Sequence, residues 1–166
     1  MAAFTKFLDV LEWLIDRISA VLIMVLIAML FVQVVNRYVL GISWPFLQFL
    51  LPFSFVWLCL LGSAVAVRKR MHFAVDMVSP RLGSQGRQWY AAIISSSVLA
   101  AGLVLVVTGV RFTDLGLLKK DPATGTSMVW IYSAIAVGGA LICVFAIEHI
   151  VRDFRSALAA HGETQP

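Results

Sequence analysis

Charge is scarce in this sequence: only 13% of its 166 residues are Asp, Glu, Lys or Arg, whereas 61% are hydrophobic. A soluble domain of this length must cover its surface with polar groups, which so few charges cannot do. Acidic residues are missing from all four long hydrophobic runs, and the mean hydropathy is +0.93. The composition therefore excludes a soluble globular domain and predicts a protein that spans the membrane.

Reactive residues are few as well. The two cysteines, Cys59 and Cys143, lie in different hydrophobic runs without a CxxC partner, so we interpret both as apolar packing residues. The sequence has no Ser-His-Asp pattern, no glycine-rich phosphate loop and no HExxH motif. We therefore expect no enzyme activity, no catalytic residue, no metal site and no cofactor. The net charge of +4 comes from basic residues at the ends of the hydrophobic runs. These residues indicate the membrane topology and contact lipid headgroups, and they do not indicate a nucleic-acid site.

Four hydrophobic runs are long enough to cross a bilayer core about 30 Å thick, which takes about 20 apolar residues. We expect an all-α membrane protein with one domain, residues 1–155, and a polar tail, residues 156–166. An amphipathic helix over residues 4–17 is expected to lie along the membrane surface, continuous with the first span or bent into it. The predicted spans are 18–40, 44–67, 90–110 and 128–147, with a polar connection over 71–89 and a loop from Thr113 to Ser127.

Basic residues are distributed unequally between the two sides of the membrane. Nine lie at the N-terminus, in the connection between the second and third spans, and at the C-terminus, against four on the other side. The positive-inside rule therefore predicts that both termini are cytoplasmic. The nine are Lys6, Arg17, Arg68, Lys69, Arg70, Arg81, Arg87, Arg152 and Arg155.

A polar cluster ends the first span. Gln33, Asn36 and Arg37 are spaced i, i+3, i+4 and share a helix face. Arg37 on its own is compatible with a side chain that extends to the lipid headgroups. Three polar side chains on one face are costly in lipid, so for the cluster as a whole we expect contact with protein, either the chain's own bundle or a partner. Small residues that permit close helix contact lie on the second and fourth spans. They are Gly62, Ala66, Ala134 and Gly138.

Two other functions are compatible with four spans. A self-contained four-helix, dimeric exporter would use a membrane-embedded glutamate in the first span, which this sequence lacks. A haem-bearing membrane anchor of a redox enzyme would use two histidines, and His72 and His149 lie near the inner ends of the second and fourth spans. Interfacial histidines are ordinary, however, and haem ligands usually lie deeper in a bundle. Glu148 and Arg152 are spaced i, i+4 and favour an ion pair at a helix end.

An ordered set of short motifs resembles the small membrane (Q-type) subunit of tripartite ATP-independent periplasmic (TRAP) transporters. The resemblance covers roughly residues 18–153. Acidic residues often follow the tryptophan that starts the second span in this family, whereas here Gln48 takes part of their polar role. The motifs are Val-Asn-Arg-Tyr-Val at 35–39, Trp44 after a short turn, Trp57, the small-residue stretch 62–67, and a basic stop with His-x-x-x-Asp at 68–76.

The resemblance implies a role in solute import. In such transporters a periplasmic binding protein delivers a small solute, usually one that bears a carboxylate, to a large multi-span subunit. That subunit moves the solute by an elevator motion driven by sodium, and the small subunit packs beside it in the bacterial or archaeal inner membrane. We therefore expect contacts with both proteins and with lipids, but not with nucleic acid. A small subunit of a tricarboxylate-type tripartite system is a related alternative.

Candidate interface residues follow from the same resemblance and from the predicted topology. His72 and Asp76 are expected to organise the inner exit of the second span. The basic pair Lys119 and Lys120 would suit an acidic patch on the binding protein. Candidates for the interface with the large subunit are Gln33, Asn36, Arg37, Trp44, Gln48, His72 and Asp76. Candidates for periplasmic contact are Ser43, Lys119 and Lys120.

Overall fold

The computed structural model describes residues 2–69 and 84–162. Within these ranges the chain folds into α1 (Ala2–Tyr38), α2 (Pro45–Arg68), α4 (Ser84–Leu118) and α5 (Val129–Gly162). Each helix contains a segment long and apolar enough to cross a membrane: Leu8–Tyr38, Pro45–Arg68, Ile93–Leu118 and Val129–Val151. This confirms the predicted all-α membrane protein with four spans. His72 and Asp76 lie outside the described residues.

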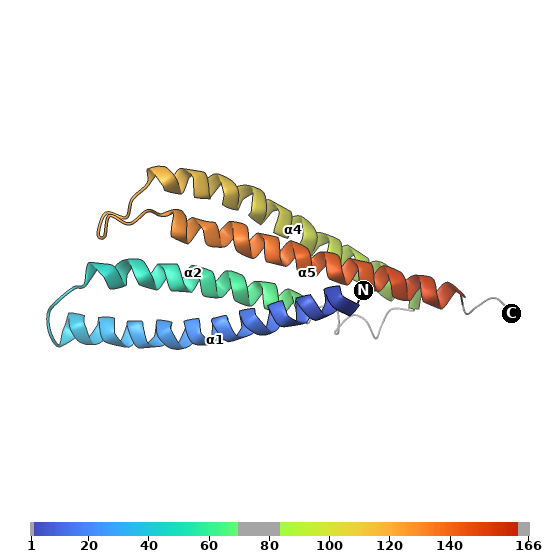
Figure 1. Cartoon of the computed structure of the whole chain (residues 1–166), viewed down its shortest axis with the longest axis horizontal. Coiled ribbons are helices and arrows are strands. Elements are labelled where there is room, and N and C mark those ends of the chain that lie inside the picture. Colours follow the sequence, from blue (N-terminus) through green and yellow to red (C-terminus); the bar gives the residue numbers. More distant parts are fainter. Residues whose placement is uncertain (1, 70–83, 163–166) are drawn as a thin grey trace.

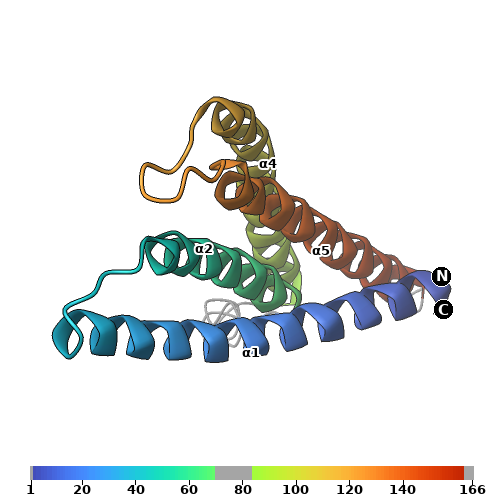
Figure 2. The same ribbon diagram turned by 60° about the vertical axis from the view of Figure 1, so that its left-hand side comes forward.

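The helices form two hairpins that meet along α2 and α5 (Figure 1). α1 packs against α2, α4 packs along α5, and α5 in turn packs on α2. In Figure 2, α1 and the C-terminal end of α4 lie on opposite sides of α2 and α5. The start of α1 and the end of α5 lie at one end of the bundle, and the turns that close the hairpins lie at the other (Figure 1).

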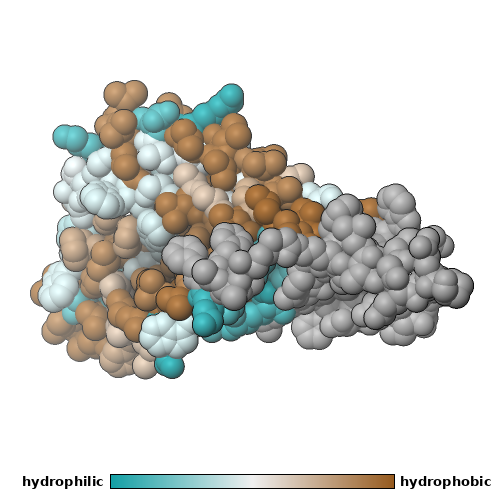
Figure 3. All heavy atoms as spheres, turned by 45° about the vertical axis from the view of Figure 1, so that its right-hand side comes forward, coloured by the Kyte–Doolittle hydropathy of each residue, from teal (hydrophilic) through white to brown (hydrophobic). Residues whose placement is uncertain are grey.

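The buried core lies toward the end of the bundle where α1 begins. Farther along α1, the most apolar stretch has no buried residue within the described chain. Met24 and Phe31 there are 69% and 70% exposed, and apolar side chains cover much of the coloured surface in Figure 3. Such a surface belongs in lipid or against another membrane protein. The core residues are Leu8, Ile15, Leu61, Ala64, Val65, Ile142 and Phe145.

Three glycines, spaced seven residues apart on α4, bring this helix close to α5. They are Gly102, Gly109 and Gly116. A Cβ atom on Gly109 would lie 2.4 Å from the backbone nitrogen of Ala136. A Cβ atom on Gly116 would lie 2.9 Å from the backbone nitrogen of Val129. Positions i and i+7 share a helix face, so only glycine fits along this seam. The seven-residue spacing of these glycines is a signal in the sequence for this seam.

The small residues that were predicted to permit close contact differ in what they touch. A Cβ atom on Gly138 of α5 would lie 2.6 Å from the Cβ atom of Leu60 on α2, and Ala134 is fully buried. Gly62, in contrast, has no heavy atom of the described chain within 4 Å of its Cβ position. Gly138 therefore supports the α2–α5 contact, whereas Gly62 makes no close helix contact in the described chain.

α1 is longer than the predicted first span. It is one continuous helix from Ala2 to Tyr38, which is about 55 Å at 1.5 Å per residue. Residues 4–17 are therefore not a separate element, in agreement with the continuous form of the two that were expected. A helix of this length exceeds the bilayer core, which is about 30 Å thick, so it must tilt or project from it.

α4 and α5 also extend past their predicted limits. α4 continues to Leu118, so the loop that was predicted to start at Thr113 starts at Lys119. The Thr113 hydroxyl donates to the carbonyl of Gly109 at 2.7 Å within the helix, and the leucines that follow are good helix formers. α5 continues to Gly162, past the predicted start of the tail at residue 156. Three alanines lie in that extension, which favours helix.

Candidate functional site

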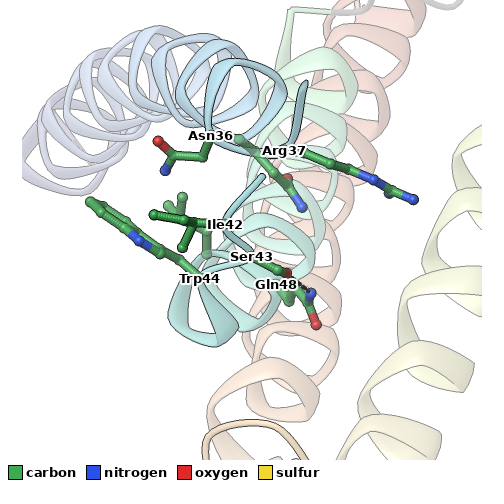
Figure 4. A pocket seen from close by; sticks show the side chains of 8 residues that line it. Asn36, Arg37, Ile42, Ser43, Trp44 and Gln48 are labelled. Carbon is green, nitrogen blue, oxygen red and sulfur yellow. Dashed lines mark hydrogen bonds between the residues drawn. The ribbon is translucent and has the colours of Figure 1, made fainter. Parts of the chain in front are cut away.

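A pocket of about 270 Å³ lies where α1 turns into α2 (Figure 4). Gly41 has a φ angle of 66°, which glycine adopts without strain. The backbone nitrogen of Ile42 then donates to the carbonyl of Asn36 at 3.0 Å. The turn thereby brings five candidates for the interface with the large subunit together with one candidate for periplasmic contact, Ser43, and two apolar residues. The lining residues are Gln33, Asn36, Arg37, Ile42, Ser43, Trp44, Leu47 and Gln48.

Asn36 contributes a buried hydrogen-bond donor to this pocket. Its side chain is 7% exposed, and its Nδ2 atom has no hydrogen-bond partner among the described residues. Figure 4 shows the amide on the same side of α1 as the indole of Trp44. A buried donor without a partner costs about 1–3 kcal/mol. The pocket is therefore suited to a group that accepts this hydrogen bond.

The other polar lining residues also present donors. Gln48 Nε2 donates to the Ser43 hydroxyl oxygen at 2.9 Å and closes one side of the pocket. Arg37 is exposed, and in Figure 4 its side chain extends away from Trp44. Among the described residues, no Asp or Glu lines the pocket. The pocket thus combines several donors with one positive charge, which suits an anionic group.

A second polar centre lies at the opposite end of the bundle, around Arg68. The side chain of Arg68 is 8% exposed, and among the described residues it pairs with three carboxylates. Its guanidinium lies 2.6 Å from Asp9, 2.6 Å from Glu12 and 3.2 Å from Glu148, and it also donates to the backbone carbonyl of Leu8. Because a buried charge must be paired, this cation ties α1, α2 and α5 together.

This centre changes the interpretation of several charges. Glu148, which was expected to pair with Arg152, binds Arg68. The side chain of Arg152 lies outside the described side chains, so the pair with Arg152 stays a prediction. The neighbouring Lys69 binds Asp16 at 2.6 Å. That hydrogen bond raises the pKa of Lys69 above its ordinary value. The acidic face of α1 therefore faces α2 and not only water.

His149 closes the C-terminal end of α2. Its Nε2 atom lies 3.1 Å from the carbonyl oxygen of Val67 and 3.0 Å from that of Arg68. Both partners are acceptors, so Nε2 carries a hydrogen and donates. A histidine at a helix C-terminus also complements the helix dipole. This nitrogen is therefore engaged with the backbone and not directed toward a haem.

The sequence contained a signal for the Arg68 centre that was not used. Asp9, Glu12 and Asp16 fall on one face of α1, within the segment that was predicted to be an amphipathic helix along the membrane surface. An acidic stripe on a helix that continues into a span requires a cation from a neighbour. Arg68 at the end of the next span is at the matching depth, because adjacent spans run antiparallel.

The loop between α4 and α5 holds the predicted basic pair. Asp121 Oδ2 accepts hydrogen bonds from the backbone nitrogens of Ala123 and Thr124, at 3.2 Å and 2.8 Å. Lys120 forms an antiparallel bridge with Ser127. Lys119 and Lys120 are exposed on this ordered turn and do not line the pocket at the α1–α2 turn. The loop therefore presents two cations on a fixed frame.

Comparison with known proteins agrees with this arrangement. A family model described as "Tripartite ATP-independent periplasmic transporters, DctQ component" matches residues 26–156. A Haemophilus influenzae protein, provisionally named a TRAP transporter small permease, is 21% identical over 156 residues, which cover 94% of each chain. The sialic acid TRAP transporter small permease protein SiaQ of Vibrio cholerae is 23% identical over 135 residues, which cover 81% of this chain and 78% of that one.

A third relative is a longer protein. The sialic acid TRAP transporter permease protein SiaT of Haemophilus influenzae is 24% identical over 145 residues. The match covers 87% of the present chain but only 23% of SiaT. The counterpart of this chain is thus one part of a larger permease polypeptide.

Proposed function

This chain belongs to the DctQ component family of tripartite ATP-independent periplasmic transporters, and we propose that it is the small scaffold subunit of a sodium-driven transporter that imports an organic acid. DctQ proteins are transporter components and not enzymes. The chain is accordingly an accessory subunit, with four spans in the inner membrane. Membership in this family argues against the three alternatives, namely the exporter, the haem-bearing anchor and the tricarboxylate-type subunit.

The bare apolar face of α1 is the observation that carries the scaffold role. The most apolar stretch of this helix has no buried residue in the described chain, and its end carries Gln33, Asn36 and Arg37. A face that needed only to meet lipid would gain nothing from such a polar end. We therefore propose that the large subunit packs along α1 and meets the pocket at its end. The match within the longer SiaT chain supports this proximity.

The class of solute and the driving ion are parts of the proposal. Two relatives are named as sialic acid transporter proteins, and sialic acid carries a carboxylate. An organic acid is therefore the favoured solute class. Solute specificity is expected to lie in the binding protein and the large subunit, because the residues of this chain offer interfaces and not a mid-membrane substrate site.

The binding protein is proposed to dock at the end of the bundle that carries the α1–α2 turn. The unequal distribution of Lys and Arg supports a periplasmic position for that end and cytoplasmic termini. Ser43, Lys119 and Lys120 are then exposed to the binding protein. His72 and Asp76, which follow Arg68 in the sequence, are proposed to support the inner end of α2.

A pull-down of the tagged protein from its native membrane in mild detergent tests the proposal. A large multi-span permease should be recovered in a fixed ratio to this chain, as identified by mass spectrometry. A homo-oligomer without such a permease would contradict the accessory role.

Uptake into cells that lack this gene alone tests the driving ion and the solute class. Candidate radiolabelled organic acids, sialic acid among them, should enter only when this chain is restored and only with an inward sodium gradient. Uptake that persists without the chain, or that is indifferent to sodium, would contradict the corresponding part of the proposal.

A further inference from the structure

Two donor groups at the pocket, those of Asn36 and Arg37, have no acceptor among the described residues. Asn36 Nδ2 is buried and unpartnered, and Arg37 has no ion pair among the described residues. Arg68 in the same chain is paired with three carboxylates in the described structure. The chain thus satisfies one of its membrane-end arginines internally and leaves the other for a group that it does not itself supply. Because the Asn36 donor and the Arg37 cation would be its neighbours, that group should be a hydrogen-bond acceptor with a negative charge.

The depth of the pocket restricts where this acceptor comes from. Gln33, Asn36 and Arg37 all lie within the membrane-spanning segment Leu8–Tyr38, and Arg37 is next to its last residue. Gln33 is about one helical turn, or about 5 Å, deeper than Arg37. A lipid phosphate sits among the headgroups and reaches Arg37 but not this depth, and a periplasmic protein stays outside the span. A membrane-embedded protein reaches both levels.

We propose that this pocket receives the carboxylate of an Asp or Glu side chain from the large subunit. The inference rests on the proposed function and names the chemistry of the contact. Asn36 Nδ2 donates one hydrogen bond to the incoming carboxylate, and the Arg37 guanidinium pairs with it. Arg37 turns inward for this, which an exposed, unbranched side chain does by changing rotamer. The turn at Gly41 and the Gln48–Ser43 bond hold the wall of the pocket in place.

Zero-length cross-linking in native membranes tests the contact. Arg37→Lys keeps the positive charge and supplies a primary amine, which a water-soluble carbodiimide joins only to a carboxylate in direct contact. An amide bond forms, and the carboxylate oxygen leaves with the carbodiimide as a urea. We expect a covalent conjugate of this chain with the large subunit, and peptide mapping should join residue 37 to an Asp or Glu within a span of that subunit.

Arg111→Lys is the matched control, because Arg111 is also exposed and lies on α4, away from the pocket. The conjugate should be about tenfold or more abundant for Arg37→Lys than for Arg111→Lys or the parent, since proximity governs the yield. The native lysines supply the same background in all three proteins. An equal yield in the three would overturn the inference.

A second variant, in the Arg37→Lys background, tests the sign of the incoming charge. Asn36→Asp keeps the shape of the side chain but replaces a donor by an acceptor. Combined with Arg37→Lys, it should lower the yield of the conjugate by about tenfold, because two carboxylates repel. An unchanged or higher yield would show that the carboxylate joined to residue 37 does not contact position 36, which would overturn the proposed contact with Asn36. Circular dichroism of the purified variants checks that helix content is retained.

The outcomes separate this inference from the proposed function. If the large subunit is recovered with the parent protein but residue 37 forms no conjugate with it, the contact proposed here is wrong and the accessory role stands. If the conjugate maps to the binding protein, the pocket is a periplasmic docking point and the inference is likewise wrong. If the parent recovers no large subunit, the proposed function itself fails.

Discussion

Arg68 and Glu148 are 80 positions apart in the sequence, yet the Nε atom of the first lies 3.2 Å from the Oε2 atom of the second. This pair joins α2 to α5, and the same arginine joins α2 to α1 through Asp9 and Glu12. The two hairpins are thus fastened to each other at the end where the core is most buried. The opposite end, with the pocket, has no comparable ionic contact among the described residues.

Replacing Arg68 should therefore destabilise the protein strongly. Arg68→Met removes the cation and leaves Glu12 and Glu148 partly buried without it, which costs about 3–5 kcal/mol in comparable buried pairs. Lys69→Met is the matched control: it breaks only the exposed pair with Asp16, so a small change is expected. Thermal unfolding of the purified proteins in detergent measures both. Equal melting temperatures for the two variants would contradict a structural role for Arg68.

A methyl group at the glycine seam should weaken the α4–α5 hairpin. Gly109→Ala places a Cβ atom 2.4 Å from the backbone of Ala136, so the helices must separate, at a cost of about 1–3 kcal/mol. Gly62→Ala makes the same change on α2, at a position where the added Cβ atom has no neighbour from the rest of the described chain within 4 Å. Because alanine favours helix, that variant should gain about 0.5–1 kcal/mol. A lower melting temperature for Gly62→Ala would instead indicate a close neighbour at this site.

Thiol labelling checks the predicted orientation. In a variant with both native cysteines replaced by alanine, Ala123→Cys on the α4–α5 loop should react with a membrane-impermeant maleimide in intact spheroplasts. Lys6→Cys should react only after the membrane is opened, because the positive-inside rule places it in the cytoplasm. Both positions are exposed in the structure. The reverse pattern would invert the topology and move the pocket to the cytoplasmic side.

Charge reversal at the basic pair tests docking of the binding protein. Lys119→Glu with Lys120→Glu should slow uptake several-fold at low ionic strength and leave recovery of the large subunit unchanged, because the pair lies outside the pocket. Added salt should narrow the difference, since it screens exposed charges. Arg111→Glu provides a control of the same sign change on α4. Equal loss of uptake in the control would show that the effect is not local.

The existence of four spans followed from hydropathy alone, because the bilayer imposes a minimum length of apolar helix. The polar cluster of Gln33, Asn36 and Arg37 was likewise visible, since such residues are costly in lipid. Their meeting with Ser43, Trp44 and Gln48 depends on the path of the turn at Gly41, which the sequence indicated only as a short connection.

The partner of Arg68 could not be predicted from spacing. Glu148 has a basic residue four positions later, which favours a local pair, whereas Arg68, which it binds, lies on another helix. The ends of α4 and α5 were misjudged for a related reason. Polar residues after a span were taken as loops, although helix propensity carries both helices beyond the hydrophobic segment.

Because the start of α1 and the end of α5 lie at the same end of the bundle (Figure 1), the chain can be lengthened at either terminus without changing which compartment the added polypeptide enters. A gene fusion to a second subunit needs only a linker if that subunit begins on the same side. If it begins on the other side, the join must add one more span. In the longer SiaT relative, the part that matches this chain occupies 23% of the polypeptide.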